Sequence, residues 1–322
     1  MPVYAFIFPG QGSQTVGMGR DLAAAFAAAR ELFEEVDETL KQKLSRLMFE
    51  GPHETLTLTE NAQPALMAMS LATLRVMETE GGFALRQKAA VVAGHSLGEY
   101  SALAAAGSFQ ITEAANLLRR RGQAMQQAVP AGDGAMAALL GVEMAAAQAI
   151  CDAAAPVPDS RTGETEVIEP ANDNGAGQVV ISGHRGAVER AVEIAKARGV
   201  RRAMLLPVSA PFHCALMAPA ADVMAEALEA TPPHPPSVPL IANVSAAKAT
   251  QPDEIRDLLV RQITATVRWR ESIETMTALG VDSFVELGAG KVLSGLIRRV
   301  APDARAHSAA TPAEIEAVLN QF

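Results

Sequence analysis

One short stretch restricts the fold of this chain more than any other. Residues 89–93 form an apolar, strand-like run that leads into residues 94–98 (Gly-His-Ser-Leu-Gly) and then into a helical pattern from Glu99. A strand that turns sharply into a helix leaves its apex residue strained, and flanking glycines let neighbouring chain pass closely. The pattern predicts a nucleophile elbow that holds the Ser96 hydroxyl out at a strand end. A plain tight turn is the alternative, because Gly-x-Ser-x-Gly also occurs by chance.

A second strand-loop-helix unit begins the chain. Residues 4–8 are typical of a buried strand, which ends at the loop 9–14 (Pro-Gly-Gln-Gly-Ser-Gln). Such loops lie at the end of parallel strands, where α/β sheets place their sites. Gln11 therefore either lines a site or only shapes the turn. The helix after the elbow aims the backbone N–H of Leu97 above Ser96, which would supply half of an oxyanion hole.

Composition narrows the class of protein. The 322 residues are 49% hydrophobic and 20% charged, enough to bury a large core. The first apolar run is too short for a signal peptide, and no stretch reaches the roughly 20 apolar residues of a membrane span, so we expect a cytoplasmic protein that contacts no membrane. Two cysteines, Cys151 and Cys214, indicate a reducing compartment with neither disulfide nor metal site. A net charge of −9 argues against nucleic-acid binding.

Two polar residues lie in predicted helices. Helical periodicity covers residues 22–47 and 59–77, and these helices should flank the sheet. Gln63 sits beside a proline near the start of the second helix, where it either belongs to the cap region or faces a cleft. A later helix opens at Ile111 and carries Arg121 at its far end. An arginine there is often only a partner of the helix dipole, so position alone leaves its role open.

The middle of the chain has a different pattern. Strands are predicted at residues 135–142, 166–171, 178–182 and 202–208, with helices at 143–154 and 187–197. This β-α-β-β-α-β order is typical of a ferredoxin-like unit. We expect residues 133–208 to form a small domain inserted into a larger α/β domain of residues 1–132 and 209–322. The polar tract 156–164 should be an exposed loop.

A general base for Ser96 must come from elsewhere in the chain. Of the six histidines, His213 is the best candidate because it lies at a loop-to-helix junction. His95 is the immediate neighbour of Ser96, so its side chain should point away from the serine. Cys214 has no local thiolate-stabilising surroundings and is a weak rival nucleophile.

Several separated stretches share one family pattern. They are residues 8–14, residues 94–99, Arg121-Gly122, Asn172 with residues 177–180 (Gly-Gln-Val-Val), and Pro211-Phe212-His213. In this order they resemble the malonyl-CoA:acyl carrier protein transacylases, and the likeness continues to residues 267–269 and 286–288. The resemblance implies an α/β-hydrolase-like large domain with an inserted ferredoxin-like small domain and an active-site cleft between them. The tract around residues 161–166 looks longer than the family pattern.

The resemblance also assigns roles by position. Ser96 matches the nucleophile and His213 the general base, with the backbone N–H groups of Gln11 and Leu97 as the oxyanion hole. Arg121 matches the arginine that holds the malonyl carboxylate. The remaining matches are Gln262, whose main-chain carbonyl orients the histidine, and the cleft-lining Gln63 and Asn172. Phe212 either narrows the space around the malonyl α-carbon, which disfavours a methyl branch, or only packs.

The reaction implied is malonyl transfer from malonyl-CoA to the phosphopantetheine thiol of acyl carrier protein. It would pass through a malonyl ester on Ser96 and show ping-pong kinetics. It would need no metal, nucleotide or prosthetic group. We expect the enzyme to be a monomer. Its product supplies extender units for fatty acid synthesis, with polyketide synthesis as the alternative. An esterase or thioesterase shares Ser96 and His213 but has no need for Arg121. A catalytically silent partner of a synthase complex would keep Ser96 only as a turn residue.

Overall fold

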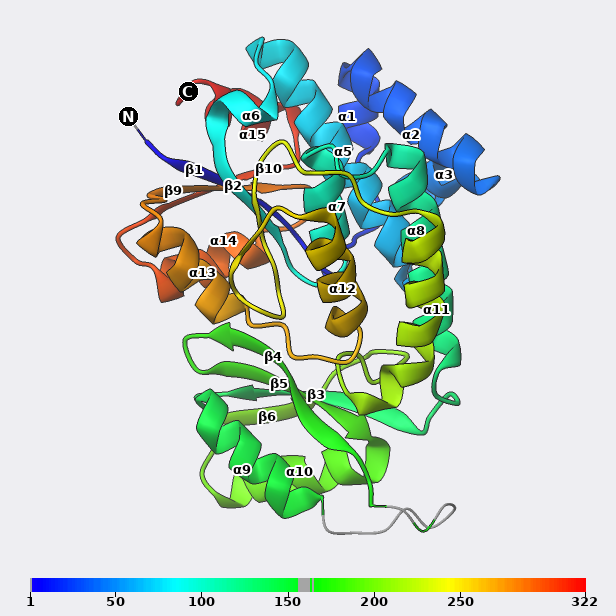
Figure 1. The fold of residues 1–322 in the computed structure, drawn as a ribbon, viewed down its shortest axis with the longest axis vertical. Coiled ribbons are helices and arrows are strands. Elements are labelled where there is room, and N and C mark those ends of the chain that lie inside the picture. Colours follow the sequence, from blue (N-terminus) through cyan, green and yellow to red (C-terminus); the bar gives the residue numbers. More distant parts are fainter. Residues whose placement is uncertain (1, 156–162, 164) are drawn as a thin grey trace.

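The chain folds around two β-sheets, as the computed structural model shows for residues 2–155, 163 and 165–322 (Figure 1). The larger sheet has the strand order β10-β9-β1-β2-β7-β8. Its strands are β1 (Tyr4–Phe8), β2 (Ala89–Gly94), β7 (Leu240–Ile241), β8 (Lys248–Ala249), β9 (Ser283–Leu287) and β10 (Arg305–Ala309). All neighbours are parallel except β7 and β8. The α/β class expected from the sequence is therefore observed.

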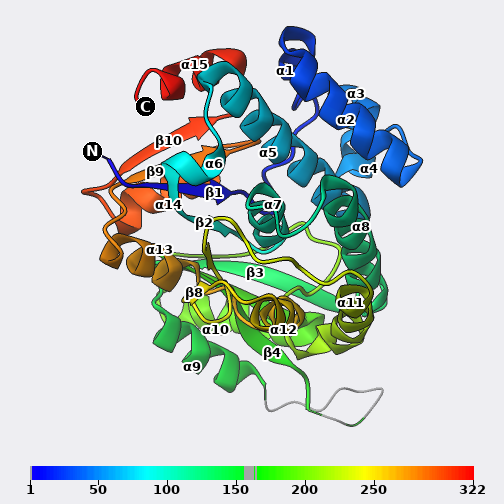
Figure 2. The same ribbon diagram turned by 45° about the horizontal axis from the view of Figure 1, so that its top comes forward.

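Helices cover both faces of this sheet (Figure 2). Along β1, Phe6 and Phe8 pack into a core with helices such as α5 and α7, whereas Ala5 and Ile7 pack into a second core with α13 and α14. Alternate side chains of a strand point to opposite faces, so an all-apolar strand requires cover on both. The helices are α1 (Arg20–Ala25), α2 (Ala27–Leu40), α3 (Leu44–Glu50), α4 (His53–Thr57), α5 (Thr59–Gly81), α6 (Leu85–Lys88), α7 (Gly98–Ala105), α8 (Ile111–Gln127), η1 (Ala215–Met217), α11 (Ala218–Ala230), α12 (Pro252–Gln262), α13 (Trp269–Ala278), α14 (Val292–Val300) and α15 (Pro312–Leu319).

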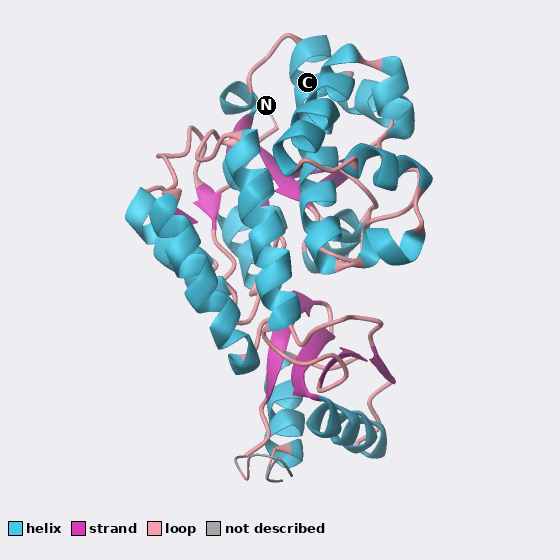
Figure 3. Cartoon of the chain, turned by 90° about the vertical axis from the view of Figure 1, so that its right-hand side faces the viewer, coloured by secondary structure: helices cyan, strands magenta, loops and turns pink. Residues whose placement is uncertain are grey.

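The smaller sheet lies apart from the larger one, and Figure 3 shows its strands at the lower end of the molecule. It contains β3 (Gly134–Leu140), β4 (Ile168–Gly175), β5 (Gln178–His184) and β6 (Arg202–Leu205) in the order β4-β5-β3-β6, all antiparallel. The helices α9 (Met144–Ala154) and α10 (Arg185–Ala197) pack on it through a separate apolar core. The predicted order of strands and helices is therefore observed. The loop predicted at 156–164 lies almost entirely outside the described residues.

Several element bounds differ from those predicted. Strand β4 runs on through Asn172 to Gly175 because it pairs with β5 on one edge and with the segment before α13 on the other, where the Asp173 N–H donates to the Val267 carbonyl at 2.9 Å. The predicted strand 202–208 ends at Leu205. The helical region 22–47 is three helices, with breaks at Phe26 and Lys41. Strand β10 and helix α15 were not predicted. Strand β10 is half-exposed, and such a strand lacks a strong apolar pattern.

The adjacency of β1 and β2 brings the two glycine loops together. The His95 N–H donates to the Phe8 carbonyl at 3.0 Å, so the elbow rests against the end of β1. A Cβ atom at Gly94 would lie 1.9 Å from the Gly98 carbonyl carbon, and one at Gly98 would lie 2.2 Å from the Phe8 carbonyl oxygen. Both glycines are therefore required by close backbone approach. Among the described residues, no helix combines the length and apolarity of a membrane span.

Gly94→Ala should strongly destabilise the fold. Its methyl group would overlap the backbone of Gly98, so we expect the free energy of unfolding to fall by about 3 kcal/mol or more. Urea denaturation measures the change. Gly295→Ala is the matched control, because a Cβ there meets nothing within 4 Å inside helix α14, and it should leave stability unchanged or raise it by up to about 1 kcal/mol. Equal midpoints for the two variants would contradict the close-approach argument.

Candidate active site

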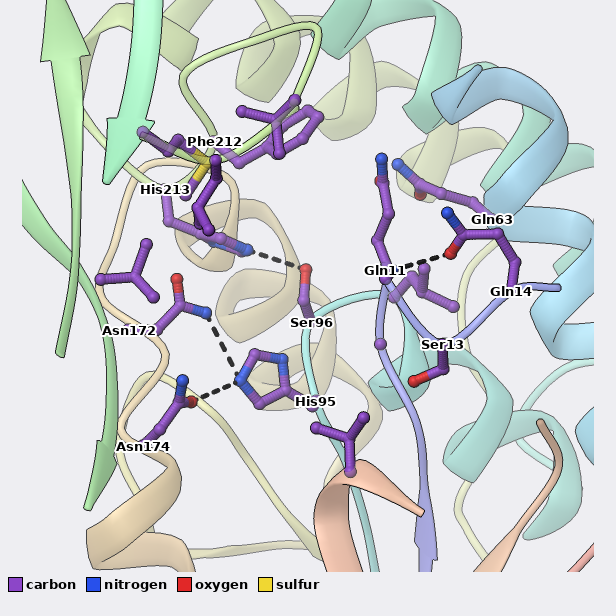
Figure 4. A pocket seen from close by; sticks show the side chains of 18 of the residues that line it. Gln11, Ser13, Gln14, Gln63, His95, Ser96, Asn172, Asn174, Phe212 and His213 are labelled. Atoms are coloured by element: carbon purple, nitrogen blue, oxygen red, sulfur yellow. Dashed lines mark hydrogen bonds between the residues drawn. The ribbon is translucent and has the colours of Figure 1, made fainter. Parts of the chain in front are cut away.

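Ser96 stands at the apex of the β2–α7 turn and faces a pocket of about 440 Å³ (Figure 4). Its φ angle is +54°, a left-handed conformation that a non-glycine residue adopts only when its surroundings impose it. The Ser96 N–H donates to Asn243 Oδ1 at 2.8 Å, and Asn243 Nδ2 donates to the Gly94 carbonyl at 2.7 Å. The Asn243 side chain thus bonds the turn both before and at its apex. The predicted elbow is present.

His213 meets Ser96 across the pocket. The Ser96 hydroxyl lies 2.8 Å from His213 Nε2, and His213 Nδ1 lies 2.9 Å from the main-chain carbonyl of Gln262. A carbonyl can only accept, so Nδ1 carries the hydrogen and Nε2 offers its lone pair to the hydroxyl. The serine and histidine that the sequence paired therefore lie within hydrogen-bond distance, although 117 positions separate them.

The imidazole of His213 is held in its neutral form. Burial, reinforced by the positive charge of Arg121, lowers the pKa of His213 to about 3. The hydrogen bond to Gln262 opposes this shift but is the weaker influence. At neutral pH the ring is therefore uncharged, and its Nε2 lone pair stays directed at the Ser96 hydroxyl.

Arg121 is buried in the pocket wall with only 1% of its surface exposed. Its Nη1 donates to Gln63 Oε1 at 2.8 Å, and its Nη2 donates to Gln262 Oε1 at 2.8 Å and to the Ser96 hydroxyl at 3.2 Å. The guanidinium also lies over the Tyr100 ring, 5.7 Å from its centroid. Helix α8 continues to Gln127, so the alternative of a C-terminal dipole partner is wrong. Burial lowers the pKa of Arg121 from its usual value.

Gln63 and Gln11 both face the pocket. Gln63 is the fifth residue of α5, is 1% exposed and bonds Arg121, which favours the cleft alternative over a cap. Gln11 lines the pocket while its side-chain oxygen accepts a hydrogen bond from Thr59 Oγ1 at 2.8 Å. Within the described chain, the backbone N–H groups of Gln11 and Leu97 donate no hydrogen bond, whereas that of Ser96 is already occupied by Asn243. Both N–H groups therefore remain available to donate to an incoming oxygen.

The opposite wall comes from the smaller sheet and the segment before α11. Asn172 and Phe212 line the pocket there, with Phe212 8% exposed and adjacent to His213 (Figure 4). The His95 ring projects away from the Ser96 hydroxyl, as expected, but still lines the pocket. Its Nε2 donates to Asn174 Oδ1 at 2.9 Å, and burial lowers the pKa of His95.

Sequence reasoning missed two buried polar residues. Glu99 is 1% exposed, and its Oε2 accepts from the Asn243 N–H at 3.1 Å and from Gln262 Nε2 at 2.7 Å. Burial raises the pKa of Glu99 to about 7. Asn243 is fully buried just after β7. Two features of the sequence could have pointed to them. Glu99 is a carboxylate at the start of an otherwise apolar helix, and Asn243 is an amide near the end of the largely apolar residues 238–244.

Comparison with known proteins decides the family. An acyl transferase domain model matches residues 5–313, and the malonyl CoA-acyl carrier protein transacylase of Bacillus subtilis is 46% identical over 99% of this chain and 97% of its own length. The chain belongs to this acyltransferase family. The Escherichia coli K12 member is also 46% identical, over 99% of both chains. The family resemblance inferred from the separated motifs is confirmed.

Solved structures of family members have the same fold. The acyl-carrier-protein-S-malonyltransferase of Bartonella henselae is 54% identical and superposes with a TM-score of 0.94 over 99% of both chains. A malonyl-transacylase in complex with its type II PKS acyl-carrier protein is 41% identical, with a TM-score of 0.93 over 99% of this chain and 100% of that one. The two-sheet α/β architecture is thus shared across the family.

The lowered pKa of His213 can be observed directly. Because burial and Arg121 hold its pKa near 3, the His213 ring resonances should not shift between pH 8 and pH 5, where an ordinary histidine titrates near 6.5. NMR of ring-labelled protein measures this, with His213→Gln to assign the signals. In Arg121→Ala the nearby positive charge is gone, so the His213 pKa should rise. A wild-type midpoint close to 6.5 would refute the argument.

Proposed function

We propose that this chain transfers the malonyl group of malonyl-CoA to the phosphopantetheine thiol of acyl carrier protein. The observation that carries the proposal is the buried Arg121 guanidinium, whose Nη2 lies 3.2 Å from the Ser96 hydroxyl beside His213. A serine and a histidine suit any acyl transfer, but an arginine at this distance selects an acyl group with a free carboxylate. Relatives named malonyl CoA-acyl carrier protein transacylase support the choice of malonyl.

In the first half-reaction, Ser96 attacks the thioester carbonyl while its proton passes to His213 Nε2. Arg121 donates to the Ser96 oxygen, so the hydroxyl hydrogen is directed to the imidazole. The backbone N–H groups of Gln11 and Leu97 then meet the oxyanion, each such donor being worth about 3 kcal/mol of barrier. The tetrahedral intermediate expels the coenzyme A thiolate, which takes the proton from His213 to become the free thiol and leaves a malonyl ester on Ser96.

Arg121 changes partners when the acyl group enters. Its two terminal nitrogens are held by the side-chain oxygens of Gln63 and Gln262, which are neutral acceptors. A carboxylate accepts two parallel hydrogen bonds from one guanidinium and so competes well for it. Acetyl-CoA offers no such group and should be a poor donor.

In the second half-reaction, the pantetheine thiol of the carrier protein attacks the Ser96 ester. His213 accepts the thiol proton and returns it to the Ser96 oxygen as the ester breaks. The structure of a related malonyl-transacylase with its type II PKS acyl-carrier protein supports a carrier as acceptor. We place the product in fatty acid synthesis. Every proton transfer is carried by protein groups, so the proposal includes no metal or prosthetic group.

The finer description of the fold is part of the proposal. The strand order β4-β5-β3-β6, with α9 and α10 as crossovers, supports a ferredoxin-like unit of residues 133–208. The mostly parallel sheet with its strand-turn-helix serine supports an α/β-hydrolase-like domain of residues 1–132 and 209–322. All proposed site residues come from one chain, which supports a functional monomer. Free thiols at Cys151 and Cys214 support a cytoplasmic location.

The Ser96 adduct tests the function. Incubation with malonyl-CoA should give a malonyl ester on Ser96, seen by mass spectrometry, which persists in water and is lost on addition of carrier protein. Arg121→Ala should lower kcat/KM for malonyl-CoA about 100-fold or more and for acetyl-CoA far less, because only malonate loses charge-assisted hydrogen bonds.

Two controls accompany the adduct experiment. Ser96→Ala should form no adduct. Arg120→Ala removes the neighbouring arginine, which pairs with Glu226 at the surface, and should leave both rates unchanged. Rapid hydrolysis of the wild-type adduct would favour a thioesterase, and absence of coenzyme A release from folded protein would favour a silent binding partner.

Phe212 is proposed to restrict branching at the malonyl α-carbon. Phe212→Ser should raise the ratio of kcat/KM for methylmalonyl-CoA over malonyl-CoA about 10-fold, since space for one methyl group is worth about 1 to 3 kcal/mol. Competition between the two donors for adduct formation on Ser96 measures the ratio. A purely packing aromatic would lower both rates and leave the ratio where it was.

A further inference from the structure

Glu99 is a buried carboxylate that the proposed reaction does not use. It lies in the first turn of α7 with 1% of its surface exposed. Its Oε2 accepts from the Asn243 N–H and from Gln262 Nε2, at 3.1 Å and 2.7 Å, while its Oε1 has no partner among the described residues. A single oxygen thus joins two residues that themselves hold the site. Burying a carboxylate costs free energy, which these two hydrogen bonds offset only in part.

The first of these residues, Gln262, has one workable amide orientation. Its Oε1 accepts from Arg121 Nη2 at 2.8 Å, and its Nε2 donates to Glu99 and to the Ser96 carbonyl at 3.0 Å. Turned over, the NH₂ group would face a guanidinium that can only donate, and the oxygen would face two acceptors. Glu99 therefore fixes the orientation that presents an acceptor to Arg121.

The second residue, Asn243, carries the influence of Glu99 to the elbow. Its backbone N–H is held by Glu99, and its side chain takes the Ser96 N–H at 2.8 Å. The main-chain carbonyl of Gln262 also orients His213 at 2.9 Å. Glu99 therefore lies where the supports of the nucleophile and of the carboxylate-binding arginine meet.

We propose that Glu99 is a positioning residue for malonyl selection, acting through Gln262 on Arg121 and through Asn243 on Ser96. The inference rests on the malonyl transfer proposed above and deepens it. Glu99 itself touches neither the acyl group nor the reacting atoms. Its contribution is to hold the guanidinium where a malonyl carboxylate meets it with the thioester in reach of Ser96.

Two conservative variants separate the effect of the length of the Glu99 side chain from the effect of its negative charge. Glu99→Asp keeps the negative charge but withdraws the carboxylate from Gln262, and should lower kcat/KM for malonyl-CoA about 10- to 100-fold. The loss for acetyl-CoA should be smaller, so the malonyl preference falls. Glu99→Gln keeps an oxygen at the same reach and should stay within about threefold of the wild type. A role in charge balance alone predicts the reverse order of the two variants.

A double-variant cycle tests the route through Gln262. If Glu99 acts through that amide, Glu99→Asp should remove no further malonyl preference once Gln262→Ala is present. Glu286→Asp is the matched control: it shortens an equally buried carboxylate, which accepts the backbone N–H groups of Leu293 and Ser294 outside this network. It should lower thermal stability and leave the malonyl-to-acetyl ratio unchanged.

The outcomes are distinct. A greater loss for Glu99→Gln than for Glu99→Asp, equal losses for both acyl donors, or additive losses of malonyl preference in the double variant would each overturn the positioning role. A wild-type protein that takes no malonyl group onto Ser96 would instead overturn the proposed function, and the Glu99 role with it. Thermal unfolding of each variant shows that the rates compared belong to folded protein.

Discussion

A positive charge buried among helices has to be satisfied by oxygen acceptors, and Arg121 draws these acceptors from three separate parts of the chain. They are Gln63 on α5, Gln262 at the end of α12 and Ser96 at the elbow. Burying an ionised group costs free energy, and hydrogen bonds to its charged end offset part of that cost. The need to satisfy one guanidinium therefore sets where two helices and the β2–α7 turn must meet, and this meeting point forms one wall of the pocket.

The same charge acts on the base. Arg121 adds to burial in lowering the pKa of His213, so the group proposed to bind the acyl carboxylate also keeps the imidazole uncharged while the pocket is empty. In the proposed reaction, a malonyl carboxylate would balance Arg121 and weaken this influence, so a protonated His213 would be easier to form as Ser96 attacks. The proposal thus links carboxylate recognition and proton transfer electrostatically. An acyl group without a carboxylate would lack this benefit as well as the hydrogen bonds.

The sequence predicted those parts of the fold and site that local patterns encode. Glycines at 94 and 98 around Ser96 specify the elbow, and the β-α-β-β-α-β order follows from periodicity. The bounds or roles of polar segments were not predicted where their hydrogen-bond partners lie far away in the sequence. The predicted strand 166–171 stops short of the polar end of β4, where the Asp173 N–H donates to the Val267 carbonyl. Arg121 could be singled out only through the family motif, because its acceptors lie 58 and 141 positions away.

Such long-range pairing also explains how two sheets create one site. The outer edge of β4 bonds the segment at Val267, shortly after Gln262 ends α12. The Arg270 side chain reinforces this contact by an ion pair with the buried Asp173 at 3.0 Å. The carbonyl that orients His213 therefore sits near the seam between the sheets. A shift of the smaller sheet would move Asn172 relative to Ser96 and would also disturb the Gln262 carbonyl. The same contacts therefore set the pocket wall and the pairing of Ser96 with His213.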